Sequence, residues 1–219
     1  DSFPAGFYYK TFMWPRSFWY KVYEPFIRKA AGFGVASIKH DKERYEHKYE
    51  YCDLLITGSG PSGLASAYSA AKNGAKVILA EDKAQFGGSL LTDDVNIGNK
   101  KGKDWANDTI KELKSMPNVI VKNRSQVFGY YDHNMMVMCE KTGDHIPDRN
   151  KYIPRQKLWY IRSKEVILST GSIERPIIFG NNDRPGIFLA SGAKEYMKVY
   201  GVLVGKNPII FTNNDTAYD

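Results

Sequence analysis

A glycine-rich turn at residues 58–63 restricts the possible folds of this chain more than any other feature of its sequence. The turn, GSGPSG, directly follows the apolar run CDLLIT (52–57) and precedes LASAYSAAKNG (64–74), in which small and apolar residues recur at helical spacing. A second apolar run, KVILAE (76–81), comes next. Strand, turn, helix and strand in this order need a parallel strand pair and a right-handed crossover. The sequence therefore predicts an α/β fold with a Rossmann-like, FAD/NAD(P)-binding domain.

Each position of the turn has a physical role in binding a dinucleotide. Gly58 permits the tight turn, Gly60 lets the backbone approach a pyrophosphate, and Gly63 lets helix and strand pack closely. Pro61 suits the first helical turn, where its missing N–H costs nothing. The N–H groups at the helix start, including that of Ser62, face the phosphates with the positive end of the helix dipole behind them. The alternative is a glycine-rich turn that binds nothing.

Acidic and glycine residues after the second strand extend the predicted site. Glu81 closes that strand 18 residues after Gly63, where a carboxylate can accept hydrogen bonds from the adenosine ribose hydroxyls. No cation replaces it, although Lys83 lies near, so the 2′-phosphate of NADP is disfavoured. A second glycine turn, with Gly88 and Ser89, lies just past the acid and can approach the ligand. A surface carboxylate and a bare turn are the alternatives.

Two later positions are candidates for further contacts with the nucleotide. Val127 starts a strand after the third parallel strand, where a backbone amide commonly pairs with adenine; a plain core valine is the alternative. Thr170 and Gly171 end the strand EVILSTG. A small residue and a glycine at that point let the backbone pass close to a cofactor, whereas a simple strand-ending turn needs no ligand.

The rest of the chain indicates further strands and helices around this unit. Helices are expected at 104–116 and 192–201, and strands at 119–122, within 125–140, at 157–169 and at 207–212. Residues from about 120 to 165 are predicted to form a β-rich, antiparallel insert. The final strand runs into NNDTAYD without a glycine motif, which indicates a second α/β unit that is incomplete at the C-terminus. We therefore expect a dinucleotide-binding domain over 52–219.

Residues 1–51 differ in composition from everything that follows. They hold half of the 30 aromatic residues and little aliphatic core. A helix is expected from Ser17 to Ala31, with Gly32 as its C-cap and Pro25 as a kink or break. Glu24 and the lack of a clean apolar face argue against a membrane-surface helix. The segment is predicted to be an arm that packs on the Rossmann unit or on a partner subunit.

Charge and cysteine content exclude several classes of function. The net charge of +7 comes from basic residues spread along the chain, and no nucleic-acid-binding motif accompanies it. Cys52 and Cys139 form no C-x-x-C pair, which excludes a local redox disulfide and a cysteine-rich metal site. Both are expected to be buried free thiols in a reducing compartment, the cytoplasm. The histidines show no metal-ligand spacing, so no metal site and no catalytic residue are assigned.

Several phrases along the chain resemble the alpha subunits of heterotetrameric sarcosine oxidases. The glycine motif with its acid, a β-rich insert and a strand ending in STG resemble flavoproteins with two dinucleotide-binding domains. The more specific phrases are FPAGFYYKTFMWP (3–15), YEPFIRKAAGFG (23–34), QFGGSL (85–90), STGSIERP (169–176), NDRPGIFLASG (182–192) and FTNNDTAY (211–218). They extend from one end of the chain to the other.

The resemblance implies a subunit of a flavoenzyme that oxidises sarcosine to glycine, a one-carbon unit and hydrogen peroxide. It implies NAD in this chain, FAD and FMN elsewhere in the complex, and beta, gamma and delta subunits as partners. The nucleotide contacts that it carries over are Gly58, Gly60, Ser62, Gly63, Glu81, Asp82, Ser89 and Val127, with Thr170 and Gly171. Two other readings stay open: an FAD-dependent oxidoreductase of the pyridine-nucleotide type, and a non-catalytic scaffold subunit of an amine dehydrogenase complex.

Overall fold

The computed structural model describes residues 14–32, 34 and 37–218. Most of the aromatic phrase at 3–15 lies outside these residues. The chain divides into two units, Asp1–Lys42 and Glu43–Asp219. Residues 16–30 of the first unit are helical. A 3₁₀ turn, η1 (Arg16–Phe18), leads into a π-helical turn, η2 (Trp19–Tyr23), and then into α2 (Glu24–Ala30).

The helix expected from residue 17 to 31 is therefore present but changes type along its length. Pro25 stands in the first turn of α2, which continues directly from the π-helical turn η2. Gly32 follows the helix with a φ of +72°, a conformation that glycine adopts without strain. The break expected at Pro25 thus coincides with the change from π-helical to α-helical structure.

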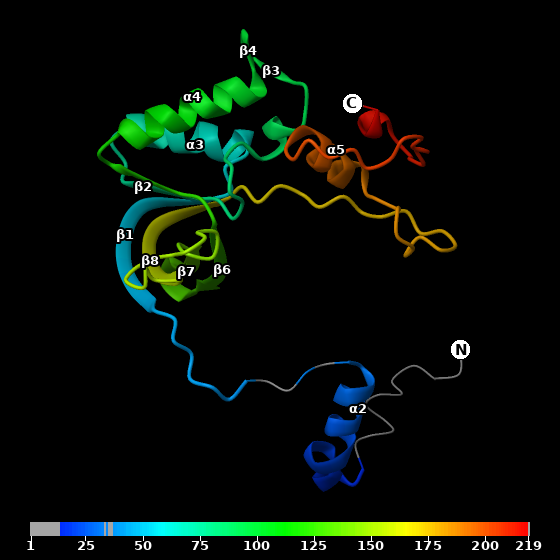
Figure 1. Ribbon diagram of the computed structural model, residues 1–219. Coiled ribbons are helices and arrows are strands. Elements are labelled where there is room, and N and C mark those ends of the chain that lie inside the picture. Colours follow the sequence, from blue (N-terminus) through cyan, green and yellow to red (C-terminus); the bar gives the residue numbers. More distant parts are fainter. Residues whose placement is uncertain (1–13, 33, 35–36, 219) are drawn as a thin grey trace. The chain divides into compact units, whose positions relative to one another are not determined.

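The second unit is built on one six-stranded sheet in the order β5-β2-β1-β8-β7-β6 (Figure 1). Strands β1, β2, β5 and β8 are parallel along this order, and β8, β7 and β6 are antiparallel. The strands are β1 (Tyr45–Thr57), β2 (Val77–Ala80), β5 (Val119–Lys122), β6 (Ser125–Tyr131), β7 (Met135–Lys141) and β8 (Gln156–Leu168). A parallel Rossmann-like sheet with antiparallel strands added is the predicted fold class, which is confirmed.

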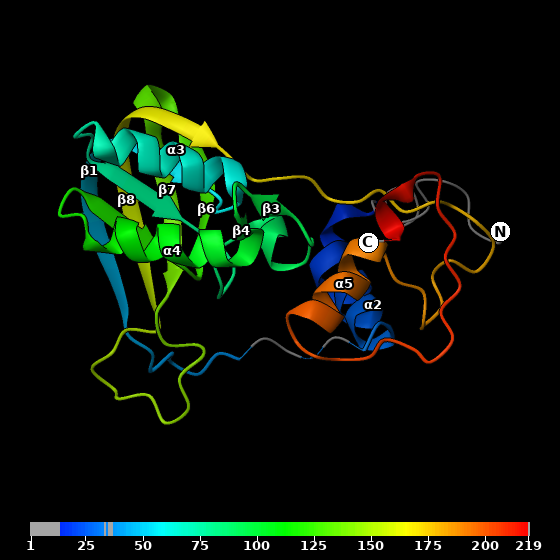
Figure 2. The ribbon, with the colours of Figure 1, turned by 90° about the horizontal axis from the view of Figure 1, so that it is seen from above.

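Two apolar clusters lie on the two faces of this sheet. Helices α3 (Pro61–Lys72) and α4 (Gly102–Ser115) run side by side over one face (Figures 1 and 2). Ile56 and Leu79 point toward these helices, whereas their neighbours Leu55 and Ile78 join a cluster with Trp159 on the other face. Adjacent strand residues alternate between faces, so β1 and β2 contribute to both clusters.

The remaining elements are short. They are η3 (Gly88–Leu91), the two-stranded β3 (Asn96–Ile97) and β4 (Lys100–Lys101), η4 (Asp132–Asn134), α5 (Ala190–Lys198) and η5 (Asp215–Ala217). Helix α5 corresponds to the helix expected at 192–201. Both cysteines are free: Cys52 is buried and Cys139 is half-buried. Burial raises the pKa of the Cys52 thiol to about 12.

Two strand expectations need correction. β1 begins at Tyr45 and not at Cys52, because its first half alternates polar and aromatic residues that are mostly exposed and so lacks the apolar signature of a buried strand. The strand expected at 207–212 is wrong: these residues form no regular structure. Ile209 is 94% exposed, and in the described part of the chain no neighbouring strand pairs with this segment, so its apolar sequence alone gives no ladder.

Candidate dinucleotide site

Two of the three motif glycines are required by close packing. Gly58 has a φ of +96°, and a Cβ there would lie 2.2 Å from the carbonyl oxygen of Ser169 at the end of β8. A Cβ on Gly63 would lie 2.0 Å from the carbonyl oxygen of Gly58. Any side chain at either position would displace backbone. These two residues therefore hold the turn against the sheet and against α3, as the sequence predicts for them.

Gly60 serves a different purpose, because a Cβ there would meet nothing within 4 Å. It is the N-cap of α3, with extended backbone (φ −67°, ψ −176°), and its carbonyl oxygen accepts the first helical bond from Leu64 N at 2.9 Å. The amides of Ser62 and Gly63 in the first helical turn have no intrahelical acceptor. Open space beside these donors at a positive helix end fits the pyrophosphate of a dinucleotide.

Ser59, which the sequence did not single out, connects the parts of this turn. It is fully buried. Its Oγ donates to Glu81 Oε2 at 2.6 Å, and its backbone N–H donates to the same oxygen at 2.9 Å. The N–H of Gly87 in turn contacts the carbonyl oxygen and Oγ of Ser59 at 3.1 and 3.2 Å. In a sequence, a Ser between the first two glycines, followed by an acid at the end of the next strand, is the signal for a residue that links the glycine turn to that strand.

Glu81 lies at the end of β2 as expected, but its carboxylate is engaged by the protein. Only 6% of the residue is exposed, and its second oxygen accepts from Lys83 N at 3.0 Å. Burial acts to raise the pKa of Glu81, yet hydrogen bonds from Asp82, Ser59 and Lys83 outweigh it and hold that pKa below its usual value. The hydrogen bond with Glu81, together with burial, raises the pKa of Asp82.

Asp82 and Lys83 are both exposed. Of the two adjacent carboxylates, Asp82 is therefore the one that faces solvent, and Glu81 holds the turn.

The second glycine turn packs directly onto the first. Gly87 and Gly88 have φ values of +128° and +55°, and a Cβ on Gly88 would lie 2.8 Å from the Cα of Gly60. Ser89 follows at the start of η3 and is exposed. The predicted contribution of Gly88 and Ser89 to the same site thus agrees with their placement beside the open space at Gly60.

The other candidate residues come from two strands: Val127 lies on β6, and Thr170 and Gly171 follow the end of β8. β6 starts beside the end of β2, since Ser125 N donates to the carbonyl oxygen of Glu81 at 2.8 Å. Val127 follows two residues later and packs partly buried against the cluster of Trp159. Thr170 N would lie 3.4 Å from a Cβ on Gly58. Gly171 is exposed, and its φ is +71°.

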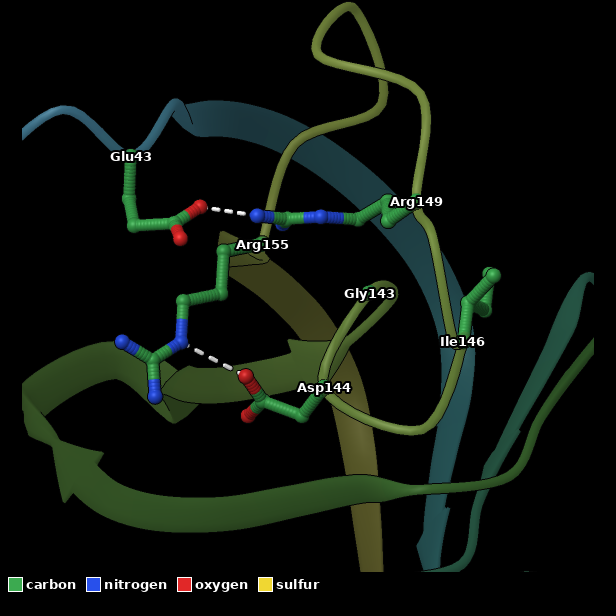
Figure 3. A pocket seen from close by; sticks show the side chains of 6 residues that line it. All are labelled: Glu43, Gly143, Asp144, Ile146, Arg149 and Arg155. Atoms are coloured by element: carbon green, nitrogen blue, oxygen red, sulfur yellow. Dashed lines mark hydrogen bonds and ion pairs between the residues drawn. The ribbon is translucent and has the colours of Figure 1, made fainter.

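A polar cavity of about 450 Å³ lies away from this site (Figure 3). Arg149 pairs with Glu43, and Arg155 donates to Asp144 Oδ1 at 2.6 Å. The loop that follows β7 lies at the starting ends of β1 and β8, whereas the glycine turn follows the other end of β1. Arg149 Nη1 is buried without a hydrogen-bond partner in the part of the chain that the structure describes.

The described residues contain neither a candidate metal cluster nor a candidate membrane-spanning helix. No group of three or more His, Cys, Asp or Glu side chains there is arranged to hold a metal ion. Among residues 14–32, 34 and 37–218, no helix combines the length and the apolar character needed to span a bilayer.

Comparisons with known proteins agree with the geometry. The family model described as FAD dependent oxidoreductase matches residues 53–116, which include the glycine turn, β2 and α4. The crystal structure of L-proline dehydrogenase from P. horikoshii superposes with a TM-score of 0.61 at 24% identity, covering 78% of this chain and 32% of that chain. This likeness shows the shared fold.

Two curated relatives carry the same name. The sarcosine oxidase subunit alpha of Rhizobium meliloti (strain 1021) is 48% identical over 98% of this chain, which spans 22% of that protein. The sarcosine oxidase subunit alpha of Corynebacterium sp. (strain P-1) is 37% identical over 85% of this chain and 20% of its own length. The chain is therefore homologous to the alpha subunits of sarcosine oxidase, over a segment about a fifth of their length that has a Rossmann-like fold of the FAD-dependent oxidoreductase type.

Proposed function

We propose that this chain is the NAD-binding part of a sarcosine-oxidase-like alpha subunit. The open space at Gly60 carries the proposal, because it leaves room for a pyrophosphate beside the first-turn amides of Ser62 and Gly63, at the positive end of α3. Asp82 is the exposed carboxylate at the end of β2 and is proposed to accept hydrogen bonds from the adenosine ribose. The resemblance of the sequence phrases to these alpha subunits implies NAD as the dinucleotide, whereas the family model that matches residues 53–116 is described as FAD dependent.

The proposed work of this chain is binding and orientation. A bound dinucleotide supplies its own redox-active ring. Gly60 leaves room for the phosphates, the start of α3 offsets their charge, and Ser59 and Glu81 hold the two glycine turns together. Val127, Thr170 and Gly171 are proposed as backbone contacts along the rest of the nucleotide. No catalytic residue is assigned among them.

The same homology supports a proposal for the activity of the whole protein. We propose oxidation of sarcosine to glycine, a one-carbon unit and hydrogen peroxide, in a cytoplasmic complex with beta, gamma and delta subunits that together hold FAD and FMN. The free state of Cys52 and Cys139 supports a reducing compartment.

Identification of the ligand released from the full-length protein tests the nucleotide proposal. We expect denaturation to release NAD, identified by mass spectrometry, and Gly60→Val to abolish it while leaving the flavins in place. If the wild type releases no NAD and the Gly60→Val variant loses FAD, seen as lost visible absorbance, the result would instead support an FAD-dependent oxidoreductase. If Gly60→Val changes no ligand content while the complex still assembles, the segment is a scaffold.

A further inference from the structure

The ammonium group of Lys83 is held by a residue far along the chain. Lys83 Nζ lies 2.8 Å from Oε1 of Glu195, on α5. Two more ion pairs connect the same helix to the segment after β2: Lys198 with Asp94 at 2.5 Å and Lys194 with Asp93 at 3.6 Å. Helix α5 is therefore attached by its charged residues to the polypeptide that follows the proposed ribose-binding carboxylate.

Lys83 stands where a cation would distinguish two kinds of dinucleotide. Its backbone N–H donates to Glu81, and it directly follows Asp82 in sequence. In dinucleotide folds of this type, a basic residue near the ribose-binding acid accommodates the 2′-phosphate of NADP. The Lys83 side chain is 53% exposed, so solvent and ligands can reach it. Its pairing with Glu195 also raises its pKa, which keeps it charged.

We propose that Glu195 is a specificity-determining residue that selects against dinucleotides bearing a 2′-phosphate; this rests on the proposed NAD site. A phosphate that approached Lys83 would compete with the Glu195 carboxylate for one ammonium group. It would also approach that carboxylate closely, and like charges repel. A 2′-hydroxyl carries no charge and meets neither penalty. Lys83 is thus a cation whose charge Glu195 already neutralises.

Competition between NAD and NADP in the full chain tests this role. Wild type and Glu195→Gln would be equilibrated with both nucleotides at equal concentration and low salt, and the bound nucleotides quantified by mass spectrometry after release. Because exposed ion pairs are worth up to about 1 kcal/mol, the NADP-to-NAD ratio should rise about three- to fivefold in the variant. Glu112→Gln is the charge-matched control, since Glu112 pairs with Lys72 at the opposite end of α3 from the glycine turn.

Two further variants separate this role from general effects on α5. Lys198→Met breaks another ion pair of the helix without touching Lys83, and it should leave the ratio within about twofold of wild type. Adding Lys83→Met to Glu195→Gln should return the ratio to the wild-type value. A gain that persists without Lys83, or that Lys198→Met reproduces, overturns the proposal.

The proposed NAD site and this inference fail in different ways. If the wild type binds NAD and Glu195→Gln leaves the ratio unchanged, only the specificity role is wrong. If the wild type binds neither nucleotide, both are wrong.

Discussion

Gly60 and Gly63 are separated by two residues, yet a methyl group has opposite consequences at the two positions. At Gly63 it would meet a backbone carbonyl oxygen at 2.0 Å, and at Gly60 it would meet empty space. Gly63 is therefore needed for close packing, whereas packing does not require glycine at position 60, where the proposed ligand would bind.

Alanine at the two positions should separate stability from binding. We expect Gly63→Ala to lower the free energy of unfolding by about 1–3 kcal/mol, since backbone must move. Gly60→Ala should leave the unfolding midpoint nearly unchanged and lower the nucleotide content, because its φ of −67° suits alanine. Urea titration and mass spectrometry of the released ligand measure the two effects. Equal destabilisation by both variants would contradict this division.

Ser59 should contribute to stability through its buried hydrogen bonds. Ser59→Ala removes the Oγ donor to Glu81 and leaves a buried carboxylate oxygen with one partner fewer. We expect a loss of about 1–3 kcal/mol in unfolding free energy. Ser115→Ala is the matched control, because that hydroxyl donates to the carbonyl oxygen of Glu112 at an exposed position. If Ser115→Ala lowers the free energy of unfolding as much as Ser59→Ala does, the buried hydrogen bond of Ser59 has no special contribution to stability.

The Glu81–Asp82 pair predicts a particular dependence of stability on pH. Since the pKa of Asp82 is raised on folding, its stabilising contribution is full below the ordinary value of 3.8 and is lost as the pH rises through the raised pKa. The lowered pKa of Glu81 works in reverse, so its contribution is present above 4.5 and disappears as the pH falls through the lowered pKa.

Asp82→Asn should therefore stabilise the protein at neutral pH, where the ionised Asp82 lies beside Glu81. The advantage over the wild type should shrink as the pH falls into the range where wild-type Asp82 is protonated. Thermal unfolding from pH 7 down to pH 4 measures the difference. An advantage that stays constant over this range would show that Asp82 does not titrate as described.

Among the elements, α5 depends on a cap from outside the helix. The Glu174 carboxylate accepts hydrogen bonds from Ser191 N at 2.8 Å and from Ala190 N at 3.3 Å. A negative charge at a helix N-terminus also interacts favourably with the helix dipole. The segment 169–176 thus reaches from the end of β8, at the glycine turn, to the start of the helix that carries Glu195.

Removal of this cap should loosen α5 locally. We expect Glu174→Ala to cost the helix about 1 kcal/mol and to speed hydrogen exchange over residues 190–198. Glu174→Gln keeps an acceptor oxygen without the charge and should fall between the alanine variant and the wild type. Faster exchange spread equally over α3 and α4 would indicate a global effect and contradict a local cap.

At the scale of the whole molecule, the βαβ core could be read from the sequence because its determinants are local. Glycine spacing, the helical period of residues 61–72 and the apolar run at 77–80 are each set by neighbouring residues. The inward direction of Ser59 could not be read, because it depends on Glu81 at the end of another strand. The first half of β1 could not be predicted either, because its backbone hydrogen bonds come from pairing with β8, which is distant in sequence, and its composition lacks the apolar pattern of a buried strand.

The exposed apolar segment at 207–212 shows the opposite case, in which a strand-like composition is not accompanied by a strand. Its sequence has the composition of a buried strand, but a strand requires a neighbour to satisfy its backbone. Where no adjacent strand in the described part of the chain supplies one, the segment stays irregular. The exposure of Asp82 and Lys83 likewise depends on how the chain turns after β2, and no local sequence pattern predicts it.

The hydrogen bonds of Ser59 also bear on how fast a ligand comes and goes. Ser59 ties the glycine turn to Glu81 and to Gly87 through hydrogen bonds made entirely by this chain's own residues, and these bonds fix the shape of the turn. Binding then orders little of the chain, so the conformational entropy lost on association is small. In such a preorganised site, differences in affinity among nucleotides are expected to arise mainly in their residence times.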